Sequence, residues 1–312
     1  MKILIVGGYG FIGGRLAVYF DSLGHDVFIC TRKNIDEAPS WCPNAAVVNI
    51  NWGDLDSIHK ACNDIDIVIH AAGVNAIESK QNPEIAMNFN GYSTGQLLNA
   101  AILNSISKFL YFSTAHVYSD QLLGDITEES IATNQHPYAT SHIMGENLVR
   151  KAHQNGDIMG IVIRLSNGYG YPMHKDVNCW MLLVNDLCRQ IKKNGSIVIN
   201  SSGKQLRDFL PLESLNDIVS HLIQLNGIKL GNGLFNVASG HSIRVIDMAE
   251  RVRHLCQKIL NKKIDLEIKG FEPKKCHDFT INIEKLINSG KAVDIDYDKE
   301  IINLFKFCIS NF

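Results

Sequence analysis

The stretch KILIVGGYGFIGGRLAVYF, residues 2–20, decides the fold. A short apolar run leads straight into a glycine-rich turn, and a helical pattern begins directly after the turn. Glycine here gives a tight turn, allows a pyrophosphate to approach the backbone and packs the helix on the strand. The free N–H groups at the start of the helix then face the phosphates. We therefore predict a dinucleotide-binding turn rather than a turn without a ligand, with contacts from Gly7, Gly10, Phe11, Ile12 and Gly13.

Short runs rich in Val and Ile alternate with helix-length amphipathic segments through the first half of the chain. This alternation is typical of a parallel sheet with helices on both faces. The predicted fold class is α/β, a doubly wound parallel sheet of the Rossmann type with a smaller C-terminal substrate-binding region. Expected strands cover 2–6, 27–30, 46–50, 66–70, 109–113 and 158–165, and expected helices cover 12–23, 55–62, 83–104 and 138–155.

The rhythm of strands and helices changes after about residue 166, where the loop NGYGYPM begins. Helices and short strands then follow without regular alternation, although the stretch 207–225 returns toward the sheet. We assign 1–165 plus about 205–235 to the dinucleotide-binding domain, and about 166–204 and 236–312 to a substrate-binding domain.

The overall composition excludes several classes of function. The 312 residues carry a net charge of -2, which gives no reason to expect nucleic acid or a membrane surface as a partner. Eight cysteines are scattered without a C-x-x-C pair or zinc-ligand spacing, so we expect no metal and free thiols in a reducing cytoplasm.

The end of the second expected strand bears on the choice of cofactor. An acidic residue there would hold a ribose 2′-hydroxyl, but this chain has Thr31, Arg32 and Lys33. Two cations suit a 2′-phosphate, so we predict that NADP is preferred over NAD. A solvated basic turn is the alternative.

Two further stretches fit an adenine pocket. NWGDLDS places Asp54 and Leu55 at its edge, although Asp54 could equally cap a helix. IDIVIHAAG ends a strand in Ala71, Ala72 and Gly73, whose small side chains let a cofactor lie close.

These residues together resemble the extended short-chain dehydrogenase/reductase family, which includes nucleotide-sugar epimerases, dehydratases and ketoreductases. The resemblance extends almost end to end. It implies a nucleotide-sugar substrate and a homodimer built from the helices expected at 83–104 and 138–155. The matching stretches are GGYGFIGG (7–14), DIVIHAAG (66–73), FLYFSTAHVYS (109–119), HPYATSHIMGENLV (136–149), VIRLSNGYG (162–170) and QLRDFLPLESLNDIV (205–219).

The resemblance also implies roles for individual residues. Tyr138 becomes the acid/base, and Thr114 becomes the hydroxyl that bonds the reacting oxygen. Asn167 and Arg207 become candidate ligands of the substrate diphosphate. Asn90 falls near the asparagine that lines the nicotinamide side, with Asn88 as the alternative.

Each of these residues also has a purely structural interpretation. Thr114 could cap the loop after its strand, and Asn167 could stabilise its turn. Arg207 could form an ion pair with the neighbouring Asp208. The stretch GFEPKKCHDFTINIEKL lacks the family's second diphosphate arginine. Lys274, Lys275 and His277 are the candidate replacements in this stretch.

His142 is the main departure from the family pattern, because the family has lysine at this position of its Y-x-x-x-K motif. Histidine has an unperturbed pKa of about 6.5, so it supplies no fixed cation at neutral pH. We still expect His142 to belong to the catalytic set, by bonding the nicotinamide ribose.

The retained pair Thr114 and Tyr138 favours a 4-ketoreductase or an epimerase of a nucleotide-linked sugar. Dehydration is disfavoured, because Ala115 and His116 follow Thr114 where family dehydratases carry Asp and Glu. The alternative function is a catalytically weak cofactor-binding or sensor protein of the same fold, which the loss of the lysine would allow.

Overall fold

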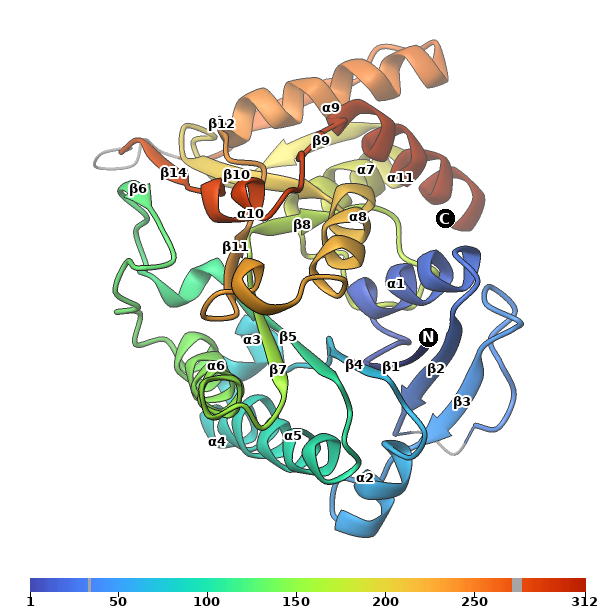
Figure 1. Cartoon of the computed structure of the whole chain (residues 1–312). Coiled ribbons are helices and arrows are strands. Elements are labelled where there is room, and N and C mark those ends of the chain that lie inside the picture. Colours follow the sequence, from blue (N-terminus) through green and yellow to red (C-terminus); the bar gives the residue numbers. More distant parts are fainter. Residues whose placement is uncertain (33–34, 271–276) are drawn as a thin grey trace.

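The computed structural model describes residues 1–32, 35–270 and 277–312. Its centre is a seven-stranded sheet in the order β11-β7-β5-β4-β1-β2-β3 (Figure 1). Each neighbouring pair of strands runs parallel, which confirms the predicted fold class. The strands are β1 (Lys2–Val6), β2 (Asp26–Thr31), β3 (Ala46–Asn49), β4 (Ile67–His70), β5 (Lys108–Thr114), β7 (Met159–Leu165) and β11 (Leu234–Val237).

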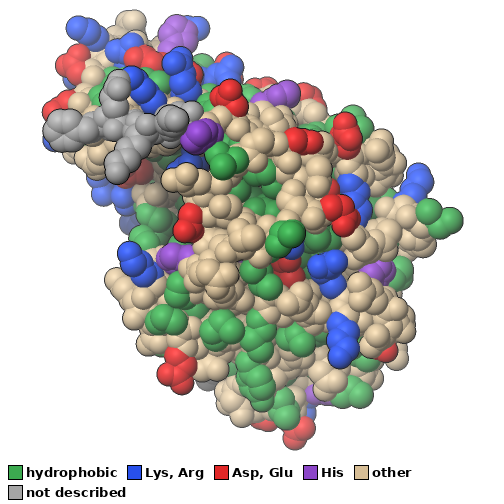
Figure 2. Space-filling view, turned by 90° about the vertical axis from the view of Figure 1, so that its left-hand side faces the viewer, with side chains coloured by type: hydrophobic (Ala, Val, Ile, Leu, Met, Phe, Trp, Pro, Cys, Tyr) green, Lys and Arg blue, Asp and Glu red, His purple; other side chains and the backbone are tan. Residues whose placement is uncertain are grey.

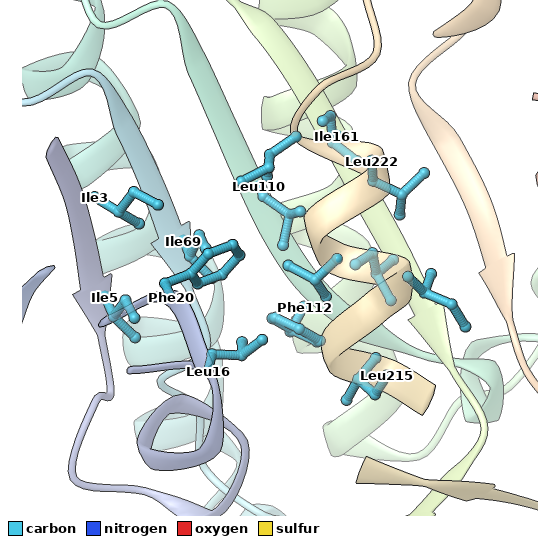
Figure 3. Close-up of a cluster of buried hydrophobic side chains, with 14 of the residues drawn as sticks. Ile3, Ile5, Leu16, Phe20, Ile69, Leu110, Phe112, Ile161, Leu215 and Leu222 are labelled. Atoms are coloured by element: carbon cyan, nitrogen blue, oxygen red, sulfur yellow. The ribbon is translucent and has the colours of Figure 1, made fainter. Parts of the chain in front are cut away.

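Helices cover both faces of this sheet. α1 (Phe11–Ser22) and α8 (Leu212–Leu222) pack on one face, where Phe20 and Leu215 contribute to a core with Ile5 and Leu110 (Figure 3). α2 (Leu55–Ala61), α5 (Thr94–Leu103) and α6 (Pro137–Asn155) pack on the other face. Successive strand residues point to opposite faces, so continuous apolar runs are needed where both faces are covered.

A single α-helix is expected over 83–104, but in the structure this helix is interrupted. α4 (Pro83–Ala86) passes into a π-helical segment, η1 (Met87–Ser93), before α5 begins. The Asn90 carbonyl in η1 accepts a bond from the Thr94 hydroxyl at 2.8 Å. Single π turns inside helices occur frequently at functional sites. Apolar periodicity predicts a helix but does not distinguish a π turn from an α turn.

The C-terminal part of the chain forms a separate apolar cluster between α7 (Leu183–Asn194), α9 (Val245–Leu260) and α11 (Tyr297–Asn311). A buried ion pair between Arg15 of α1 and Glu300 of α11, at 2.7 Å, joins this cluster to the sheet. Smaller sheets pair β8 (Asn167–Tyr169) and β12 (Ser242–Arg244) with β10 (Leu206–Pro211), β9 (Ser196–Ile199) with β13 (Asp265–Ile268), and β6 (Gly124–Ile126) with β14 (Phe279–Ile281).

Short helices complete the described part of the chain: α3 (Ala76–Gln81), η2 (Ala115–Val117), η3 (Gly227–Lys229) and α10 (Glu284–Asn288). Within the described residues, no helix combines the length and the apolar character that crossing a bilayer requires.

Candidate active site

The glycine turn between β1 and α1 packs closely against the end of β4. Gly7 has a φ of +88°, and a methyl group on it would lie 2.7 Å from the backbone nitrogen of Ala72. A methyl group on Gly13 would lie 2.3 Å from the carbonyl oxygen of Gly7. The first helical turn of α1 therefore approaches the turn as closely as only glycine allows.

A cavity of about 500 Å³ opens at the carboxyl ends of β1, β2 and β4. Ligands of open parallel sheets bind at this edge. The glycine turn and the residues that follow β4 both border this cavity. Its lining includes seven of the predicted cofactor residues: Gly7, Gly10, Phe11, Arg32, Ala71, Ala72 and Gly73.

Three aromatic and basic side chains border the β2 side of this cavity. The guanidinium of Arg32 lies 5.5 Å from the centre of the Phe89 ring, and Phe89 packs edge-on against Trp52 at 5.4 Å. Sequence reasoning missed both aromatic residues. Trp52 could have been noticed as an aromatic residue directly after the third strand, whereas Phe89 comes from the π-helical segment.

Two of the predicted cofactor residues, Asp54 and Leu55, do not line this cavity. Lys33 lies outside the described residues. Asp54 caps α2, because its side chain accepts a bond from the backbone nitrogen of Asp56 at 3.0 Å. Leu55 begins α2 and is exposed. The cofactor contacts expected of these residues stay predictions.

Tyr138 and Thr114 come together at the end of β5. Pro137 is the first residue of α6, and His136 caps the helix by accepting a bond from the Tyr138 nitrogen at 3.2 Å. Tyr138 thereby stands at the start of a rigid helix, and its hydroxyl is close enough to the Thr114 side chain for Thr114 to lower its pKa. Thr114 also accepts a bond from the His116 nitrogen at 3.1 Å, so it caps the loop as well.

Among the described groups that act on Tyr138, only the Thr114 side chain lowers its pKa. Burial raises the pKa of Tyr138 above 10, and Thr114 offsets only part of this rise. The ring of His142 packs edge-on against Tyr138 at 4.6 Å. Burial lowers the pKa of His142 to about 4, so this imidazole is neutral at pH 7.

Asn90 anchors the loop that follows β4. Its side-chain oxygen accepts a bond from the Val74 nitrogen at 2.8 Å, and its amide donates to the Ser141 hydroxyl at 3.0 Å. Asn90 is buried, whereas Asn88 is exposed. Asn90 therefore ties the cofactor cavity to α6, and Asn88 has no comparable position.

Asn167 and Arg207 both line two smaller cavities. Asn167 donates to the Asp208 carbonyl at 2.8 Å. The Asp208 carboxylate is occupied by Ser239 and by the His241 nitrogen, at 2.8 and 3.2 Å, rather than by Arg207. The guanidinium of Arg207 is exposed toward the cavities.

The two cavities differ in their lining. The one of about 250 Å³ contains His116 and His277. Lys274 and Lys275 lie outside the described residues. The one of about 420 Å³ is lined by apolar side chains from several elements, including Leu182, Val198 and Phe209. Sequence reasoning missed this cavity, because isolated apolar residues far apart in the chain carry no signal of a binding site.

Gly13→Ala is expected to weaken dinucleotide binding by at least about 10-fold, since the new methyl group forces α1 away from the turn. Gly14→Ala is the matched control. Its methyl group would meet the flexible Met173 side chain at 3.2 Å, and binding should stay close to the unmodified value. Titration of both variants with NADP and NAD gives the comparison, and equal affinities for the two variants would contradict it.

Comparison with known proteins finds relatives that are named as nucleotide-sugar enzymes. The chain is 26% identical over 279 residues to a dTDP-D-glucose 4,6-dehydratase of Dictyostelium discoideum, covering 80% of this chain and 61% of that longer protein. It is 26% identical to a putative UDP-glucose 4-epimerase of Methanocaldococcus jannaschii, covering 81% of both chains. The structure of RMD from Pseudomonas aeruginosa complexed with NADPH superposes with a TM-score of 0.82 at 19% identity, covering 100% of this chain and 99% of the other.

A family model provides the broader assignment, and it confirms the resemblance drawn from the motifs. The model of the NAD dependent epimerase/dehydratase family matches residues 3–238, from β1 to the end of β11. The chain belongs to this family of NAD-dependent enzymes.

Proposed function

We propose that the protein is an NAD(P)-dependent oxidoreductase that acts on a nucleotide-linked sugar, as a 4-ketoreductase or an epimerase. The observation that carries this proposal is that residues next to Thr114 and Tyr138 border two of the cavities. Ala115, next to Thr114, lines the cavity that Arg207 shares. His142, packed on Tyr138, lies against Gly73 of the other cavity.

The residues around these cavities suit the two parts of this reaction. A nicotinamide cofactor in the larger cavity would supply or accept the hydride. Tyr138 gives a proton to the sugar oxygen, or takes it, as the carbon changes oxidation state. Thr114 bonds the same oxygen and stabilises the charge that develops on it. Arg207 offers a planar guanidinium that suits the oxygens of a diphosphate.

The residues after Thr114 favour reduction or epimerisation over dehydration. Dehydration requires a further acid and base beside the sugar. Ala115 supplies neither, and burial lowers the pKa of His116, which together with the nearby Arg207 keeps its imidazole neutral. Tyr138 and Thr114 suffice for a reductase or an epimerase.

Incubation with NADPH and a panel of nucleotide-linked 4-keto sugars tests the proposal. We expect loss of NADPH absorbance with at least one sugar of the panel, or interconversion of hydroxyl epimers when NAD(P) is bound. The account is wrong if the protein binds neither dinucleotide nor nucleotide.

A cofactor-binding sensor is the second candidate, and the neutral His142 favours it. Without a cation next to Tyr138, proton transfer at neutral pH lacks the help that the family's lysine gives. Tight NADP(H) binding without turnover of any nucleotide-linked sugar would select the sensor.

We further propose that NADP is preferred over NAD, because Arg32 borders the cavity beside Phe89. Arg32→Ala should weaken NADP binding by about 10-fold, since a charged hydrogen bond to the 2′-phosphate is lost. NAD lacks that phosphate and should bind the variant as it binds the unmodified protein. A parallel loss of affinity for both cofactors would refute the assignment of Arg32 to the 2′-phosphate.

We also propose a homodimer through the face formed by α4, η1, α5 and α6. Figure 2 shows hydrophobic side chains gathered on the lower half of the face on which α4 and α6 lie. Ile85, Met87, Tyr92 and Leu103 of α4, η1 and α5 are exposed large hydrophobic residues. A contiguous apolar patch on a soluble protein indicates an interaction surface.

Tyr92→Lys is expected to weaken this dimer, because it places a charge at the centre of the apolar patch, where Tyr92 is 60% exposed. Sedimentation velocity should then show a monomer at concentrations where the unmodified protein is a dimer. A monomeric unmodified protein would overturn the proposal.

The cysteines support a reducing compartment such as the cytoplasm. All seven cysteines in the described residues are free and buried. Disulfides are instead common in proteins of oxidising compartments.

A further inference from the structure

Tyr111 is a buried residue of β5 that the proposed chemistry does not use. Its hydroxyl lies 3.0 Å from Nδ1 of His142 and 3.1 Å from the carbonyl oxygen of Asn90. Tyr111 is 1% exposed, so its hydroxyl depends on these protein partners rather than on water.

A count of protons assigns the direction of these bonds. A phenol has one proton to donate. The Asn90 carbonyl can only accept, and it has room for the Tyr111 hydroxyl at 3.1 Å beside the Thr94 hydroxyl at 2.8 Å. Tyr111 therefore donates to Asn90, and Nδ1 of His142 supplies the proton of the bond between His142 and the Tyr111 oxygen.

The bond at one ring nitrogen fixes the state of the other. A neutral imidazole that donates at Nδ1 has no proton on Nε2, which can then accept a hydrogen bond. A methyl group placed on Gly73 would lie 3.9 Å from Nε2 of His142, so this nitrogen faces Gly73. Gly73 in turn lines the proposed cofactor cavity.

We infer that Tyr111 is a positioning residue, whose oxygen accepts from His142 and holds the imidazole in the Nδ1–H form with the unprotonated Nε2 directed to the proposed cofactor cavity. There Nε2 accepts a hydrogen bond from a ribose hydroxyl of the dinucleotide. The ribose contact rests on the proposed function, whereas the state of the imidazole does not.

The groups that surround His142 keep it neutral without making it a cation. Tyr138 on α6 and Tyr111 on β5 are neutral phenols, and burial lowers the pKa of His70 on β4 to about 3. Glu146, one turn further along α6, is paired with Arg164 at 2.7 Å. The pair Tyr111–His142 therefore supplies a hydrogen bond where the family's lysine supplies a hydrogen bond and a charge.

Nitrogen NMR of histidine-labelled protein tests the imidazole state without any ligand. His142→Leu identifies the two signals of His142. We expect a protonated Nδ1 and an unprotonated Nε2 that do not titrate between about pH 5.5 and 8. A protonated Nε2, or signals that titrate near pH 6.5 as in a free histidine, would overturn the inference.

Tyr111→Phe removes only the hydroxyl and should move the His142 signals toward those of an imidazole that exchanges between its two neutral forms. Tyr118→Phe is the matched control, because it removes another buried hydroxyl, bonded to Asn236 at 2.6 Å. His142 signals that stay unchanged in Tyr111→Phe would contradict a positioning role.

Dinucleotide binding gives the second measurement. Tyr111→Phe should weaken binding by about 5-fold, the effect of one hydrogen bond, and should change it little when His142 is already Leu. Equal losses in both backgrounds would show that Tyr111 does not act through His142. If the unmodified protein binds no dinucleotide, the proposed function fails, and the NMR result still decides the state of His142.

Discussion

Tyr138→Phe is expected to lower kcat by about 10³-fold while leaving dinucleotide affinity nearly unchanged. The substitution removes the phenolic oxygen that passes the proton, and it retains the ring that packs on His142 at 4.6 Å. Thr114 still bonds the reacting oxygen, so a small residual rate should remain. Steady-state rates with a sugar that the unmodified enzyme turns over, together with NADP titration, provide the measurement.

Tyr19→Phe serves as the control for this change. It removes a hydroxyl bonded to Asp217 at 2.7 Å, far along α1 from the glycine turn. Its rate should match that of the unmodified enzyme. A Tyr138→Phe variant with near-normal kcat would mean that the proton travels by another route and that the Tyr138–Thr114 pair is not the reaction centre.

Glu300→Ala is expected to lower the free energy of unfolding by about 3–5 kcal/mol. The carboxylate is buried and accepts from Arg15 at 2.7 Å and from the backbone nitrogens of Tyr171 and Glu213 at 3.3 and 3.1 Å. Its removal leaves the buried guanidinium of Arg15 without a counter-charge. Denaturant unfolding followed by circular dichroism measures the loss.

The neighbouring Lys299 provides a matched control for the buried pair. Its ion pair with Glu213 is exposed, at 2.6 Å, and Lys299→Ala should leave the free energy of unfolding nearly unchanged. Similar losses for Glu300→Ala and Lys299→Ala would show that Arg15 and Glu300 do not hold α1 and α11 together.

The fold and the first half of the site could be predicted because their signals are local. The glycine spacing at 7–13 indicates a close backbone contact that only glycine permits. Pro137 before Tyr138 marks the start of a helix, and the small residues after β4 mark a close approach. Each of these features depends on residues adjacent in the chain, so periodicity and turn chemistry reveal them.

The rest of the site depends on residues that meet only in the folded chain. Tyr111 is one apolar-looking position within a buried strand, and nothing in its neighbourhood indicates a bond to His142. Phe89 borders the cofactor cavity from the π-helical segment η1, which an ordinary helical pattern does not reveal. Glu300 lies 285 residues from its partner Arg15, beyond the reach of any local pattern.

A structure of the protein with NADP and a nucleotide-linked sugar bound tests the central claim most directly. The account predicts that the hydroxyl oxygens of Tyr138 and Thr114 both bond the reacting sugar oxygen, beside the nicotinamide C4 atom, with the diphosphate near Arg207. A dinucleotide bound away from the glycine turn, or a sugar held away from Tyr138, would contradict it.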